Sequence, residues 1–379
     1  MGYAWPFGAD NRNIVDFQVG ARRRATQDDG KLLGLELLRF ASALAVLLCH
    51  YKLFAQMMGM PAVARSAQPF YALLWPFYDH GYYGVQVFWG ISGFIFFRKY
   101  GAAIHSRLVT AGEFFWLRFS RLYPLHIATL AAVVALQAVH RDLAGRDFAY
   151  PATDGAMLVR QLFLATDWTT RARLSFNGPI WSISAEIAVY VCFFLLARRF
   201  APSWRLCLGV VVAGLALELA GLRWASIGCA TYFFAGGLAA IMSANRRAAA
   251  AGALGAIIIV GWFSGALGDR GKLPTILLLA VPCLLILMSQ PMVFADRWQR
   301  AIQFAGNLTY SSYLLHFPLQ ILLAILVAAS GATPPLASPL FLLAYLGVTL
   351  SLAALSYRLF ELPAQKWLRG LSLQRPTPA

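Results

Sequence analysis

The segment LLGLELLRFASALAVLLCHYKLF, residues 32–54, decides the fold class of this chain. Apolar residues dominate it, and it exceeds the roughly 18 residues that a helix needs to cross a bilayer core of about 30 Å. Inside that core the backbone must satisfy its own hydrogen bonds, which a helix does within one segment. We therefore predict that residues 32–54 form a transmembrane helix.

The rest of the chain repeats this pattern. Of its 379 residues, 59% are apolar and 13% are charged, whereas a soluble domain has about 25% charged residues. The mean hydropathy is +0.62. We predict an all-α protein, a polytopic transmembrane helix bundle of about ten spans. The spans are expected near residues 32–54, 81–97, 117–139, 179–197, 204–220, 226–243, 249–265, 273–290, 309–329 and 339–359.

The basic residues of the linkers indicate the orientation of these spans. Linkers on the side of the N-terminus are rich in arginine, whereas the linkers 55–80 and 330–338 on the other side contain only Arg65. Because basic loops stay in the cytoplasm, the chain is predicted to lie in the cell inner membrane with both termini on its cytoplasmic side. The predicted organisation is a cytoplasmic N-terminal segment 1–31, a transmembrane domain 32–363 and a cytoplasmic tail 364–379.

Two kinds of partner are not expected. The formal charge is +16, from 32 basic and 16 acidic residues, but positive cytoplasmic loops explain this charge without a nucleic acid. The five cysteines lie in or beside apolar segments and form no CxxC pair or Cys/His cluster with zinc spacing. The sequence therefore predicts neither a metal site nor a disulfide framework.

Polar residues in the first span are the first candidates for a functional site. Arg39 and His50 are eleven positions apart, so on a helix they lie within about 20° of one face and about 16 Å apart along its axis. A charge at bilayer depth costs at least about 2.5–3.5 kcal/mol and usually has a role. There is also an explanation without a functional role: Arg39 would contact lipid headgroups, and His50 would cap a helix end.

A second candidate is the segment FWLRFSRLYP, residues 115–124. Arg118 and Arg121 are three positions apart and share a helix face at the predicted cytoplasmic boundary. Guanidinium groups suit phosphate oxygens. Anchoring to anionic lipid is the alternative explanation for this pair.

Four further segments place polar groups in apolar surroundings. The segment YYGVQVFWGISGF, residues 82–94, contains Gln86 and Ser92, which can hydrogen-bond between helices, although close packing also explains its glycines. The segment NGPIWSISAEI, residues 177–187, begins like a helix and places Glu186 one turn after Ser182. A carboxylate at that depth needs a partner, and the predicted topology puts His50 at a similar depth.

Two of the four lie near the C-terminus. The segment YSSYLLHFP, residues 310–318, contains His316, which we expect to be a hydrogen-bonded interior histidine. The segment YRLFELP, residues 357–363, closes the last span at the inner face.

Together, and in this order, these six segments resemble the integral-membrane acyltransferase-3 family, whose members include O-acetyltransferases of bacterial surface polysaccharides. The matching elements are the Arg39-ten-His50 spacing and the segments 84–93, 118–124, 177–186, 310–318 and 357–363. Many members have Asp where this chain has Gln86, so the resemblance leaves Glu186 or another group to orient the histidine. The chain ends soon after its last span, so acyl transfer is expected to be completed within the membrane domain.

The resemblance implies a membrane O-acyltransferase. Its donor is cytoplasmic acetyl-CoA or another acyl-CoA, and its acceptor is a hydroxyl of a cell-surface or exported glycan. Acetyl is the expected acyl group. In this interpretation His50 is the base and Glu186 fixes its tautomer. Either direct attack by the acceptor or an acyl-histidine fits the sequence. Donor binding falls to Arg39, Arg118 and Arg121, and the supporting residues are Gln86, Ser92, Trp181, Ser182, Ser184, Tyr310 and His316.

A proton-coupled transporter or flippase is the alternative, because such proteins also contain buried arginine, histidine and glutamate. The chain shows no inverted repeat of the kind that marks many transporters. Dependence on acetyl-CoA with release of free CoA separates the two classes, because a transporter needs neither.

Overall fold

The computed structural model describes residues 32–152, 154–168, 174–243, 248–263 and 273–373, and this part of the chain is helical, without a β-strand. The helices are α2 (Leu33–Met57), α3 (Tyr71–His80), α4 (Gly84–Phe96), α5 (Ala102–His105), α6 (Ala111–Ala144), α7 (Gly155–Leu162), α8 (Ile180–Arg199), α9 (Trp204–Leu219), α10 (Ala225–Met242), α11 (Ala248–Phe263), α12 (Leu273–Met288), α13 (Asp296–Ser330), α14 (Pro339–Ser356) and α15 (Leu362–Leu373). Short π-helical turns follow α4 and α14.

The predicted class, a polytopic α-helical membrane protein, is confirmed. Within the described residues, six helical stretches are long and apolar enough to cross a membrane: Leu33–Met57, Ala111–Ala144, Ile180–Arg199, Ala225–Met242, Asp296–Ser330 and Pro339–Leu371. Each of the ten predicted spans contains an α-helix, but the span count and the side of the termini stay predictions. The predicted N-terminal segment 1–31 lies outside the described residues, and α15 occupies most of the predicted tail.

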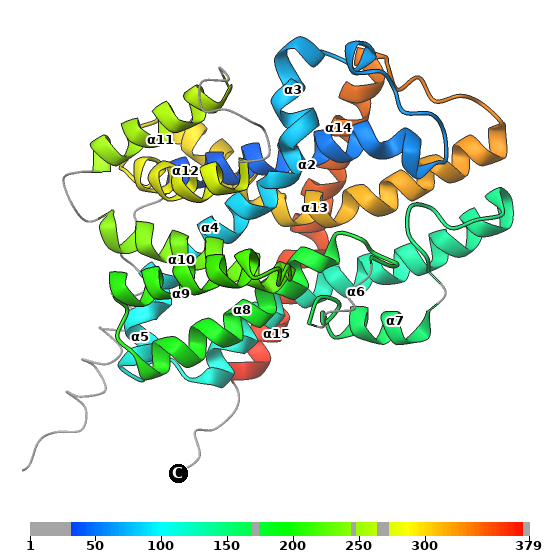
Figure 1. Cartoon of the computed structure of the whole chain (residues 1–379). Helices are drawn as coiled ribbons and strands as arrows, with labels where there is room; N and C mark the ends of the chain where they lie inside the picture. The colour runs from blue at the N-terminus through cyan, green and yellow to red at the C-terminus, as the bar shows by residue number, and fades with distance from the viewer. Residues whose placement is uncertain (1–31, 153, 169–173, 244–247, 264–272, 374–379) are drawn as a thin grey trace, which may run out of the picture.

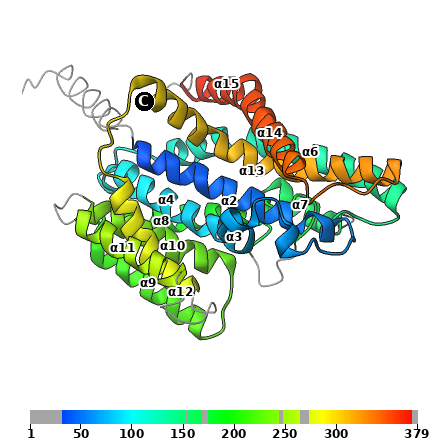
Figure 2. The ribbon, with the colours of Figure 1, turned by 90° about the horizontal axis from the view of Figure 1, so that it is seen from above.

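The helices form two groups with α2 and α4 between them (Figures 1 and 2). One group contains α9, α10, α11 and α12, and α10 packs against α4. The other contains α6, α13 and α14, and α13 packs against both α2 and α6. Segments distant in sequence, such as α2 and α13, are therefore neighbours at the centre of the molecule.

Helix α6 begins earlier and ends later than the predicted span 117–139, because its ends are capped. Thr110 and Glu113 form a capping box, in which each side chain accepts the backbone N–H of the other residue. At the other end Gly145 adopts the left-handed conformation, with φ of 70°, which favours glycine as a helix terminator. The extension places Arg118 and Arg121 more than one turn inside the helix.

Glycines allow α4 and α10 to approach each other closely. A Cβ atom on Gly93 would lie 1.8 Å from the carbonyl oxygen of Phe233, and one on Gly236 would lie 1.9 Å from the carbonyl oxygen of Gly90. Beside this contact the rings of Phe96, Phe193 and Phe233 meet edge to face, with centroids 5.5–5.7 Å apart. Small residues at helix contacts and such ring pairs hold helices together where the surrounding lipid is as apolar as the protein.

Substitution of Gly93 by alanine should therefore disrupt the contact of α4 with α10. Overpacking of this kind costs about 1–3 kcal/mol, so Gly93→Ala should lower the apparent melting temperature of the detergent-solubilised protein. Gly209→Ala in α9 is the matched control, because no other group lies within 4 Å of its added Cβ. Equal melting temperatures for Gly93→Ala and Gly209→Ala would contradict this account of the packing.

Candidate active site

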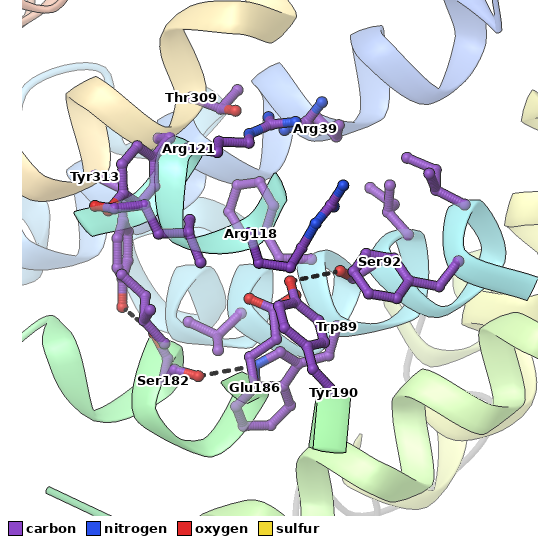
Figure 3. Close-up of a pocket in the computed structure, with 18 residues that line it drawn as sticks. Arg39, Trp89, Ser92, Arg118, Arg121, Ser182, Glu186, Tyr190, Thr309 and Tyr313 are labelled. Carbon is purple, nitrogen blue, oxygen red and sulfur yellow. Dashed lines mark hydrogen bonds between the residues drawn. The ribbon is translucent and has the colours of Figure 1, made fainter. Parts of the chain in front are cut away.

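A partly open cavity lies where α2, α4, α6, α8 and α13 meet. Its polar lining comes from all five helices, whereas α4 supplies most of its apolar wall (Figure 3). The lining residues are Arg39, Val85, Phe88, Trp89, Ile91, Ser92, Ile95, Phe96, Arg118, Arg121, Leu122, Ser182, Ile183, Glu186, Tyr190, Thr309, Tyr310 and Tyr313. A large cavity with convergent polar groups is the usual form of a small-molecule site.

Three guanidinium groups point into this cavity. Arg39 pairs with Glu36 on its own helix at 3.3 Å. Arg118 is half-buried; it donates a hydrogen bond to the Tyr100 hydroxyl at 2.8 Å and lies over the rings of Phe96 and Tyr100. Arg121 is exposed and makes no hydrogen bond or ion pair within the described part of the chain. The cavity thus has two cations held by neighbouring groups, Arg39 and Arg118, and one, Arg121, that is free to meet an anion.

Glu186 is the carboxylate on the cavity wall. The hydroxyl groups of Ser92 and Tyr190 lie 3.3 Å apart beside it, and Arg118 and Arg121 are within electrostatic range of it. With Arg39 the lining has three cations and one anion. Because Glu36 already pairs with Arg39, the remaining excess of positive charge favours an anionic ligand.

The wall of the cavity nearest to α13 is formed by Tyr313. Its hydroxyl lies 2.7 Å from Ser182 Oγ and donates to the Pro179 carbonyl oxygen at 3.0 Å. Trp89 Nε1 donates to the Ser182 carbonyl oxygen at 3.4 Å, and the Trp89 ring meets the ring of Trp181 edge to face. These contacts fix the start of α8 against α4 and α13.

His50 lies beyond this wall and does not line the cavity. Its Nδ1 lies 2.9 Å from the Val46 carbonyl oxygen, and because a carbonyl only accepts, this contact puts the proton on Nδ1 and leaves the lone pair on Nε2. The expectation that Glu186 fixes the tautomer is therefore wrong for this structure, since Val46 does so. The ring next to His50 is that of His316, at a centroid distance of 4.7 Å.

His316 is interior, as expected. It is fully buried beside the backbone of Ser312 and Tyr313, and neither ring nitrogen makes a hydrogen bond of good geometry within the described part of the chain. Its ring lies 6.0 Å from that of Tyr313. Tyr313 therefore separates the cavity from a pair of histidines, one from α2 and one from α13.

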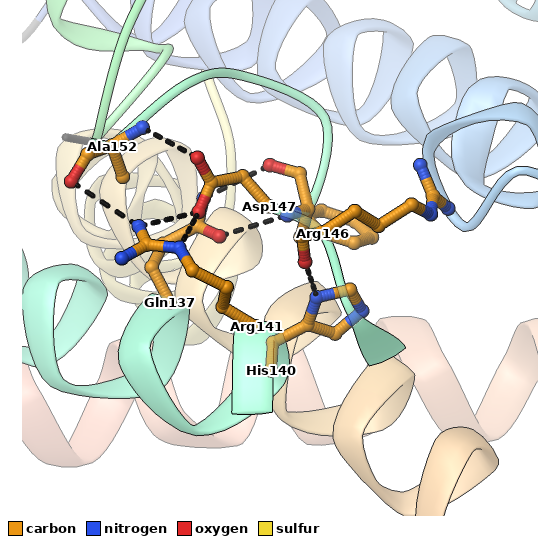
Figure 4. A network of polar contacts seen from close by, with 7 residues as sticks. Gln137, His140, Arg141, Arg146, Asp147 and Ala152 are labelled. Atoms are coloured by element: carbon orange, nitrogen blue, oxygen red, sulfur yellow. Dashed lines mark hydrogen bonds and ion pairs between the residues drawn. The ribbon is translucent and has the colours of Figure 1, made fainter. Parts of the chain in front are cut away.

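A network of polar contacts lies at the C-terminal end of α6 and in the turn that follows it (Figure 4). The amide of Gln137 exchanges two hydrogen bonds with the backbone of Phe148, at 2.8 and 2.9 Å. Arg141 pairs with Asp147, which also accepts from the backbone N–H of Ala152. These contacts hold the turn after α6. They place the rings of Phe148 and Tyr150 against Phe317, the neighbour of His316, each at 5.8 Å.

The remaining predicted residues divide between the cavity and its surroundings. Tyr310 lines the cavity and donates to the Leu122 carbonyl oxygen. Gln86 does not line it; its amide lies 3.2–3.3 Å from the carbonyl oxygens of Tyr82 and Tyr83. Ser184 faces the loop before α8 and accepts from the backbone N–H of Asp167.

Sequence reasoning missed Trp89, Tyr190, Thr309 and Tyr313, which line the cavity. Trp89 and Tyr313 lie inside the segments singled out above, but their apolar and aromatic side chains carry no signal of a site until the helices are packed. Within the described residues, no group of three or more His, Cys, Asp or Glu side chains could hold a metal ion.

The fold and the cavity define a polytopic membrane protein with a cavity lined by three arginines. The acyltransferase domain family matches residues 32–358. The chain therefore belongs to the acyltransferase-3 family of integral membrane proteins.

Two curated relatives support this assignment. The chain is 32% identical to "Acyltransferase MdmB" of Streptomyces mycarofaciens, over 44% of the chain and 40% of that protein. It is 29% identical to "Protein 2 in picA locus" of Rhizobium radiobacter, over 28% of the chain and 62% of that protein. The chain thus spans less than two thirds of either relative. No solved structure is significantly similar to it.

Proposed function

We propose that this protein is a membrane acyltransferase, which takes an acyl group, preferably acetyl, from acyl-CoA and transfers it to a hydroxyl of a cell-surface or exported glycan. The observation that carries the proposal is the cavity with three arginines, whose far wall, Tyr313, adjoins the histidine pair. CoA combines phosphates with a long, neutral arm that ends in the thioester. A cationic cavity next to a buried imidazole suits both ends of such a donor.

The arginines hold the phosphates. Guanidinium forks bind phosphate oxygens through charge-assisted hydrogen bonds. Arg118 is already oriented by Tyr100, and Arg121 is free to close on the ligand. Because Arg39 and His50 are about 16 Å apart along α2, the donor extends past Tyr313 to bring its thioester to His50.

His50 handles the proton. Its Nε2 lone pair takes the proton of the acceptor hydroxyl while the hydroxyl oxygen attacks the thioester carbonyl carbon. The C–O bond forms, the C–S bond breaks, and the thiolate of CoA receives the proton back from His50. The same lone pair serves the alternative route, in which Nε2 first accepts the acyl group. Both routes yield an ester and free CoA, without a net proton.

Loss of the imidazole should abolish this transfer. General acid–base catalysis contributes about 10²–10⁴-fold, so His50→Ala should reduce CoA release by at least that factor. The assay follows free thiol from acetyl-CoA in proteoliposomes, with candidate glycans added and equal amounts of inserted protein. His105→Ala is the matched control, since His105 contacts the Ala197 carbonyl oxygen outside the cavity.

Two results would overturn parts of the proposal. Unchanged CoA release by His50→Ala would remove His50 from the chemistry. If the folded wild-type protein released no CoA with any acceptor, the proposed donor would be wrong, and a transported solute would become the next candidate ligand.

The phosphate role of Arg121 is testable with two donors. A hydrogen bond to a charged group contributes about 1.5–3 kcal/mol, so Arg121→Gln should raise KM for acetyl-CoA by about 10- to 100-fold and leave kcat unchanged. S-Acetylpantetheine has no phosphate, so its KM should not respond to the substitution. Arg205→Gln, at the start of α9 and away from the cavity, is the control. An equal KM increase for both donors would contradict phosphate binding by Arg121.

A further inference from the structure

The imidazole of His316 lowers the stability of the helix bundle, and no packing requirement explains it. It is fully buried on α13, and neither ring nitrogen makes a hydrogen bond of good geometry among the described residues, although the backbone of Ser312 and Tyr313 is nearby. A buried polar group that is poorly hydrogen-bonded lowers stability, whereas a phenylalanine ring would fill the same space without that penalty. Packing alone therefore does not account for an imidazole at this position.

Helix α13 contacts His50 at two points, its ring and its backbone. The His316 ring lies 4.7 Å from the His50 ring, at an interplanar angle of 51°. One turn further along α13, Gln320 Nε2 donates to the His50 carbonyl oxygen at 3.1 Å. Together with the contact of Nδ1 to Val46, these interactions limit the rotation of the His50 side chain.

The charge that develops on His50 has no carboxylate beside it. In the proposed reaction His50 becomes an imidazolium when Nε2 takes a proton, and no ion pair joins it to an acidic side chain in the described part of the chain. The neighbouring His316 ring, 4.7 Å from that of His50, presents polar nitrogens and an aromatic face. Both stabilise a nearby cation more than an aliphatic side chain does.

We propose that His316 is a positioning residue for His50, which holds the His50 ring in place and stabilises its imidazolium form during acyl transfer. This inference rests on the proposed function of His50. It assigns a role in the reaction to the second member of the histidine pair and extends the machinery from α2 to α13.

The test compares two substitutions of His316. The variant with the higher melting temperature should have the lower kcat. His316→Phe keeps a ring and removes both poorly hydrogen-bonded nitrogens, so its apparent melting temperature should equal or exceed that of the wild type. Its kcat should fall by about 100- to 1000-fold, the loss seen when a preorganised electrostatic donor is removed, while KM for acetyl-CoA stays unchanged. His316→Gln restores a polar group, so it should recover part of kcat while melting at a lower temperature than His316→Phe.

His126→Phe is the matched control, since His126 is also fully buried but contacts the Gln161 carbonyl oxygen on α7. Its kcat per folded protein should equal that of the wild type. Wild-type kcat in His316→Phe, with His50→Ala inactive, would overturn the role of His316 alone. Losses of kcat that simply follow the melting temperatures would also overturn it, because a structural role predicts that order. Full activity of His50→Ala would instead refute the proposed function.

Discussion

A charged side chain inside a membrane-spanning bundle must be compensated, and this requirement governs how the centre of the molecule is built. Arg39 pairs with Glu36, Arg118 lies between a tyrosine hydroxyl and two aromatic rings, and Glu186 faces two hydroxyl groups and two arginines. Each partner comes from a packed helix or the turn beside it, so the cavity exists only when those helices are assembled. The close contact of α4 with α10 matters for the same reason, because it fixes the apolar wall opposite the charges.

Helix α13 connects the two parts of the site. Tyr310 and Tyr313 line the cavity, and His316 and Gln320 continue past the cavity wall to the ring and backbone of His50. The separation of the arginine-lined cavity from the histidine pair suits the proposed function. Phosphates require cations and access to water, whereas acyl transfer benefits from a site that excludes water. Tyr313, held by Ser182 and Pro179, stands at the boundary between these environments.

Much of the fold was predictable, because a long apolar run has few alternatives to a helix. All ten predicted spans contain helices, whereas α3 and α7 were not predicted, since neither is a long apolar run. The three arginines were predicted as a group, and the structure brings them to one cavity. The partners of His50 were not predictable: a one-turn difference in how α13 packs on α2 would replace His316 by another residue, and the sequence does not set that register.

The most direct measurement is a cryo-electron microscopy structure of the protein in lipid nanodiscs with a thioether analogue of acetyl-CoA, which cannot undergo transfer. The account predicts density for the diphosphate within hydrogen-bond distance of Arg118 and Arg121, and density for the acyl end past Tyr313 against His50. An analogue bound elsewhere, with this cavity empty, or one whose acyl end points away from His50, would contradict the central claim that donor binding and acyl transfer occur in this one connected site.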